Sequence, residues 1–87
     1  MDRKPFKAPI TVYLKDPGEF HLICDLANAS DFLFDHWAGN DSANWIFAID
    51  KCSAAMMGKI SPEEARTAFI TAMKGAEIQI NCEVSLP

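Results

Sequence analysis

The stretch from Ser42 to Gly58 constrains the fold of this 87-residue chain more than any other segment. Its apolar residues recur at helical spacing and form one broad stripe, made of Trp45, Ala48, Ile49, Cys52, Ala55 and Met56. Ile46 and Met57 fall well off that stripe, and Phe47 falls nearly opposite it. A helix that is apolar on more than one side is usually packed on more than one side. The pattern therefore predicts a central helix, or a helix that meets a partner chain.

Length and charge restrict the possible classes of protein. A chain of 87 residues is expected to form a single domain, spanning residues 1–87, with modest stability. The net charge of −4 argues against nucleic-acid binding, because phosphate neutralisation needs a concentrated basic face. No apolar run is long enough for a membrane-spanning helix, and the start of the chain lacks the apolar segment of a secretion signal. A cytoplasmic protein is the default expectation.

The first quarter of the chain has the pattern of a β-hairpin. Residues 1–7 contain a proline and are expected to form a flexible arm. Residues 10–14 and 20–24 alternate in side-chain character, as strands with one buried face do. Residues 15–19 between them combine Asp, Pro and Gly, which favour a turn.

Two helices are predicted to follow the hairpin. Asp25 is placed to cap the first, which Gly39 and Asn40 would end. Its predicted core stripe is Leu26, Ala29, Phe32, Leu33 and Trp37. Asp41 or Ser42 would cap the central helix, and Gly58 would end it.

A third helix and a third strand complete the prediction. Ser61 begins a capping box with a proline at the first helical position, and Gly75 is the expected stop. The predicted core stripe of this helix is Ala65, Ala68, Phe69, Ala72, Met73 and Ala76. Residues 77–84 alternate again and predict a C-terminal strand. The expected fold is α+β: a two- or three-stranded sheet, built from the N-terminal hairpin and this strand, packed against three helices.

Several segments resemble a proteobacterial family of small single-domain proteins of unknown function. The resemblance covers about residues 6–80 and depends on FKAPITVYL, DFLFDHW, AIDKCSAAMMG and EEARTAFITAMKGAEI. Each of these segments is a packing or capping pattern. The resemblance therefore implies no activity, cofactor, partner or functional residue.

Cysteine and histidine do not form a recognisable site. Cys24, Cys52 and Cys82 lack the paired spacing of a zinc site, and His21 alternates away from Cys24 on the second strand. Cys52 lies within the apolar stripe, which favours a core residue over a nucleophile. We expect no metal and no cofactor.

Two polar features have a structural and a functional interpretation. Asp31 and Asp35 lie one turn apart beside His36, which suits an acid pair or a cation contact, although a solvated helix face is the commoner explanation. Arg66 flanks the third helix stripe, where it could bind an anion or lay its stem along the core edge. Trp37 is expected in the core.

The favoured functional hypothesis is a non-enzymatic interaction or regulatory module, acting as a homodimer or as an adaptor for another protein. Its expected contact surface includes Ile46, Phe47 and Met57, because a domain this small cannot easily bury every apolar residue off its main stripes. An open sheet edge is a second candidate surface.

The alternative hypothesis is a small-molecule-binding domain or a small enzyme. Its pocket would lie between sheet and helices, near Tyr13, His21 and His36. The sequence contains no phosphate-binding loop, nucleophile elbow or metalloprotease motif, so it gives no positive reason to expect an enzyme.

Overall fold

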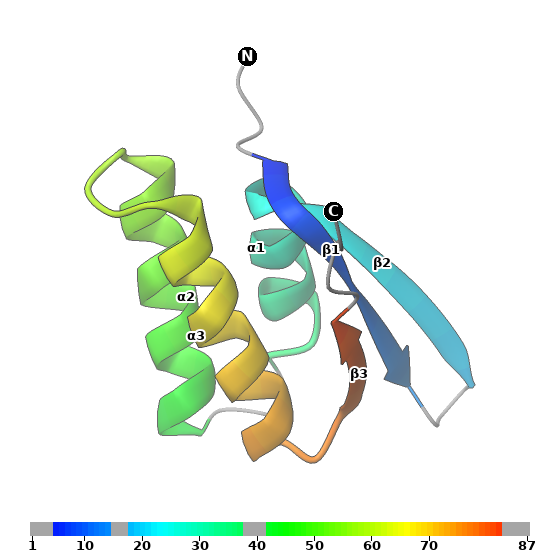
Figure 1. Ribbon diagram of the computed structural model, residues 1–87. Helices are drawn as coiled ribbons and strands as arrows, with labels where there is room; N and C mark the ends of the chain where they lie inside the picture. Colours follow the sequence, from blue (N-terminus) through cyan, green and yellow to red (C-terminus); the bar gives the residue numbers. More distant parts are fainter. Residues whose placement is uncertain (1–4, 15–17, 38–41, 83–87) are drawn as a thin grey trace.

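Within residues 5–14, 18–37 and 42–82, which are the residues described by this computed structural model, three antiparallel strands form a sheet and three helices lie on one side of it (Figure 1). The elements are β1 (Pro5–Leu14), β2 (Glu19–Asp25), α1 (Leu26–Asp35), α2 (Ala43–Met56), α3 (Pro62–Gly75) and β3 (Gln79–Cys82). The predicted α+β class and the element order are confirmed. The strand predicted at 77–84 spans Gln79–Cys82, and residues 83–84 lie outside the described part.

The central strand is β1, which pairs with β2 on one side and with β3 on the other. Its paired segment with β3 is Ile10–Tyr13, which follows both prolines of the strand. This placement suits proline, which has no N–H to donate to a ladder. The strand starts at Pro5, so the expectation of an arm over residues 1–7 is wrong for residues 5–7. Burial of Phe6 in the core explains why the strand extends this far.

The two faces of the sheet differ in what covers them. Ile10, Val12 and Ile23 point towards the helices and are fully or nearly fully buried. On the other face, Tyr13 lies opposite Phe20 across the β1–β2 ladder, and both side chains are exposed.

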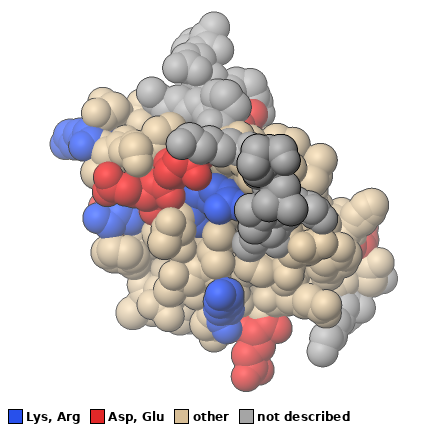
Figure 2. All heavy atoms as spheres, viewed as in Figure 1, with Lys and Arg blue, Asp and Glu red and all other residues tan. Residues whose placement is uncertain are grey.

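Each helix begins at a side-chain cap that satisfies a backbone N–H. The Asp25 carboxylate accepts from the Asn28 N–H at 2.8 Å, and Ser42 accepts from Trp45 at 3.2 Å. Ser61 accepts from Glu64 at 3.2 Å, so the predicted capping residue of α3 is confirmed. Acidic side chains gather near the start of α3 in Figure 2, where they complement the positive end of the helix dipole.

Two helix ends differ from the prediction. Helix α1 stops at Asp35, so Trp37 lies beyond it and is 39% exposed instead of buried in the core. The predicted stop at Gly39 and Asn40 lies outside the described residues. Helix α3 includes Gly75, which was expected to end it. A Cβ at Gly75 would lie 2.9 Å from the side-chain Nδ2 of Asn44, so this glycine allows α2 and α3 to approach closely.

Two side-chain hydrogen bonds join the elements around the core. The indole N–H of Trp45 donates to the Leu33 carbonyl at 2.9 Å and so joins α2 to α1. The Nε of Arg66 donates to the Ala8 carbonyl at 3.0 Å and so joins α3 to β1. The predicted core stripe of α3 is buried from Ala65 to Met73.

Candidate interaction surface

Helix α2 has two adjacent stripes with the same spacing. The core stripe is Trp45, Ala48, Cys52 and Ala55, and all four side chains are buried. The second stripe repeats the pattern one residue later, at Ile46, Ile49, Ser53 and Met56. Ile49 is half-buried and Met56 is exposed, so the prediction that Met56 belongs to the core is wrong.

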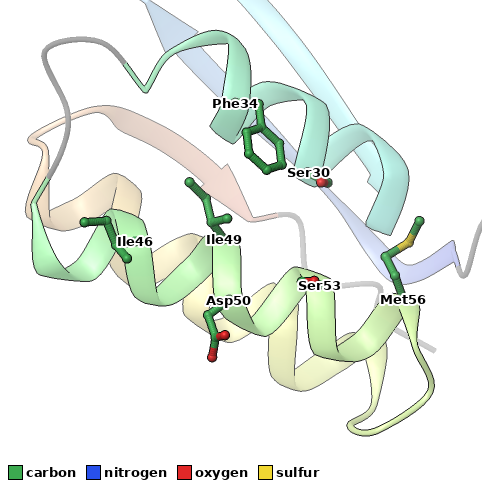
Figure 3. A pocket seen from close by; sticks show the side chains of 7 residues that line it. All are labelled: Ser30, Phe34, Ile46, Ile49, Asp50, Ser53 and Met56. Carbon is green, nitrogen blue, oxygen red and sulfur yellow. The ribbon is translucent and has the colours of Figure 1, made fainter.

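The second stripe forms one wall of a groove between α1 and α2, which we call the α1–α2 groove (Figure 3). Its volume is about 410 Å³, and it is lined by Ser30, Phe34, Ile46, Ile49, Asp50, Ser53 and Met56. In Figure 3, Phe34 points from α1 towards α2, while Ile49 and Met56 point from α2 towards α1. Asp50 is directed away from α1 and lies at the rim.

Side-chain size explains why this groove is hollow. Ser30 on α1 and Ser53 on α2 are small, whereas Phe34, Ile46 and Met56 are large and stand around them. These three apolar side chains are 54%, 48% and 48% exposed, respectively. The groove is therefore an apolar rim around a depression with two hydroxyl groups, which can accept side chains from another molecule.

The groove contains only one of the three predicted surface residues. Ile46, Phe47 and Met57 are all exposed, and Ile46 lines the groove. Phe47 lies on another flank of α2, where the Lys51 ammonium lies 4.9 Å from its ring centroid. Met57 is the C-cap of α2. Sequence reasoning did not include Ser30 and Ser53 in this surface. The spacing of the second stripe is a signal that could have indicated Ser53, whereas no sequence signal places Ser30 of α1 opposite it.

A second, smaller groove lies between β2 and α1. Its volume is about 180 Å³, and it contains both histidines expected near a pocket, with the rings of His21 and His36 5.8 Å apart. Asp31 and Asp35 also line it. Tyr13 does not, because its side chain lies on the outer face of the sheet.

The two cysteines whose side chains are described, Cys24 and Cys52, differ in exposure. Cys52 is fully buried, and burial raises the pKa of its thiol to about 11, so it stays protonated at neutral pH. Cys24 is exposed. Among the described residues, no group of three or more His, Cys, Asp or Glu side chains is placed to hold a metal ion. None of the described helices has the length and apolar character needed to cross a membrane.

Residues 8–80 match the family described as "Protein of unknown function (DUF982)". The chain belongs to the DUF982 family. This match confirms the predicted resemblance to a family of unknown function. No curated protein and no solved structure matches this DUF982 chain.

Proposed function

We propose that this DUF982 chain is a protein-interaction module that holds the apolar side of a partner's helix in the α1–α2 groove. The observation that carries the proposal is the second stripe of α2, which has the 3-4-3 spacing of a helix-packing surface and is left partly exposed beside a groove. Helix-in-groove recognition uses apolar anchors at this spacing.

The shape of the groove suits a helix. Ser30 and Ser53 leave room for a large anchor side chain, and Phe34 and Met56 stand where they would pack beside it. Covering exposed apolar surface stabilises a complex by roughly 25 cal/mol per Å² before the costs of association. Asp50 at the rim favours a basic residue on the partner helix.

The alternative of a small-molecule pocket between sheet and helices has less support. The groove that contains His21 and His36 has a volume of about 180 Å³. Typical ligand pockets have volumes of roughly 300–1,000 Å³. The groove expected to hold a small molecule is therefore smaller than a typical ligand pocket, which leaves this alternative with less support.

Site-specific photocrosslinking in cells tests the proposal. A photoreactive residue at Ser53 should give a covalent adduct with another protein, and mass spectrometry should map it to an amphipathic helix. The same residue at Phe47, on a different flank of α2, is the matched control and should give little adduct. Ile46→Asp should abolish the adduct formed from Ser53.

Three outcomes would count against this function. Equal crosslinking from the two positions would show that the groove is not selective. An adduct mapped only to the chain itself would make a second copy the occupant of the groove. Crosslinks from Ser53 that persist in Ile46→Asp would show that the second stripe is not the contact.

A further inference from the structure

The outer edge of β2 is open to pairing. Within the described residues, β2 has β1 as its only neighbouring strand. The Cys24 N–H donates to the Asn28 side chain at 3.2 Å, so it points to the free edge and away from β1. Main-chain groups of alternate residues point to the same side of a strand. The N–H and C=O groups of Phe20 and Leu22 therefore also point to the free edge.

The smaller of the two grooves follows this edge, and we call it the β2-edge groove. Its strand side is His21, Leu22 and Ile23, three consecutive residues. Consecutive side chains point to opposite faces of a sheet, so three in a row can line one groove only where the groove runs along the strand edge. The hydrogen bond from Cys24 to Asn28 shows that α1 already supplies one acceptor to this edge.

The charge of the β2-edge groove is one-sided. Asp31 and Asp35 line it from α1, and among the residues that the structure describes no lysine or arginine lines it. Glu19, at the start of β2, lies 3.4 Å from the Nε2 of His21. A segment entering this groove would therefore place its side chains beside carboxylates.

We propose that the β2 edge binds an extended segment of a partner protein in which Lys or Arg alternates with apolar residues. The segment would add a strand to the sheet through the main-chain groups of Phe20 and Leu22. Its basic side chains would face α1 and meet Asp31 and Asp35. Its apolar side chains would lie on the outer face of the sheet, where Phe20 and Leu22 are exposed.

The same features disfavour a second copy as the added strand. The β2 strand of another copy has Glu19 and Asp25 and contains neither lysine nor arginine. Antiparallel pairing would bring these carboxylates next to an acidic groove, and like charges that face each other are destabilising.

The β2-edge groove also lies on a different face of α1 from the α1–α2 groove, so this inference does not depend on the proposed function.

A synthetic peptide of about eight residues, alternating Lys and Val, is the probe, since this length spans a strand. Added to the full chain at low ionic strength, it should protect the amide hydrogens of Phe20 and Leu22 from exchange. The same peptide with Glu in place of Lys should bind about tenfold more weakly or worse, because the attraction becomes repulsion.

Two pairs of variants separate the backbone from the charge. Leu22→Pro removes the edge N–H, while Leu22→Ala keeps it, so only the proline variant should lose protection of the edge. Asp31→Asn with Asp35→Asn should weaken binding about three- to tenfold. Asp50→Asn, at the rim of the α1–α2 groove, is the control and should leave the affinity unchanged.

The proposal is overturned if the Lys and Glu peptides bind equally or if neither binds. It is also overturned if protection of Phe20 and Leu22 rises with protein concentration alone, because a second copy would then pair at this edge. Ser53→Leu, which fills the α1–α2 groove, should leave peptide binding intact. Failure of one surface would therefore not be mistaken for failure of the other.

Discussion

The two stripes of α2 have the same spacing but different environments. The core stripe, which contains Trp45 and Cys52, is closed off by the rest of the fold. The second stripe, which contains Ile46 and Ser53, faces the α1–α2 groove and remains partly open. Helical periodicity alone does not determine which of two neighbouring stripes is buried, because burial depends on what the rest of the fold brings against each.

The length of α1 helps to explain why the second stripe is less buried than the core stripe. It ends at Asp35 after 10 residues, whereas α2 has 14, so α1 is about 6 Å shorter. The core stripe packs against both α1 and α3. The indole of Trp45 bonds the Leu33 carbonyl, and the small residue Ala68 on α3 is buried in the same core. Within the described residues, the second stripe faces α1, which presents Ser30 and Phe34 to it.

The largest expected effect contrasts neighbouring residues on the two stripes. Trp45→Ala should lower the free energy of unfolding by about 3–5 kcal/mol, because it leaves a cavity and removes the donor to the Leu33 carbonyl. Ile46→Ala, one residue later, should cost less than about 1 kcal/mol. Urea unfolding of both variants measures the contrast. Similar losses would show that the two stripes are not distinct.

The second expected effect is a dependence of stability on pH that arises from Cys52. Burial raises the pKa of this thiol from 9.0 to about 11 in the folded chain. The folded state therefore holds its proton to higher pH than the unfolded state. The contribution of the protonated Cys52 thiol to the free energy of unfolding is fully present below pH 9. It is lost as the pH rises through about 11, and the total loss is about 2–3 kcal/mol.

Cys52→Ala is the control for this effect, since other groups also titrate above pH 9. The free energy of unfolding of the native chain should fall more steeply between pH 9 and 11 than that of the variant. Parallel pH profiles would mean that the Cys52 thiol is accessible to water, which would contradict its place in the core stripe. A thiol at an exposed position of the second stripe would not add this pH dependence to the free energy of unfolding.

Local patterns in the sequence were enough to predict most of the fold. Asp25 and Ser61 precede their helices as capping residues, and the alanines and Phe69 of α3 define its buried side. The sequence could not place Trp37, because the end of α1 depends on how it packs against its neighbours. Met56 extends the periodicity of the core stripe, which predicts burial, but its side chain is 48% exposed.

The candidate surface was harder to predict than the fold. Exposed apolar residues on α2 were expected, but a groove exists only where two helices meet, and serines give no apolar signal. Ser30 and Ser53 are far apart in sequence and line the same groove. Phe47 is apolar and exposed, as Ile46 is, but it does not line the groove, and composition could not separate these two residues.

The smallest expected effect comes from comparing the same substitution, to leucine, at the neighbouring residues Cys52 and Ser53. Cys52→Leu places extra atoms in a fully buried position and should cost about 1–3 kcal/mol through overpacking. Ser53→Leu places the same atoms in the α1–α2 groove, which has room, so its free energy of unfolding should change by no more than about 0.5 kcal/mol. Chemical denaturation of both variants gives the stabilities, and crosslinking from a photoreactive residue at Ile49 reports on the groove. A stable Ser53→Leu chain that no longer forms the adduct would show that a partner needs the space above Ser53. A stable chain that forms it as before would show that the groove is not where the partner binds, and a destabilised one would show that the second stripe is packed after all.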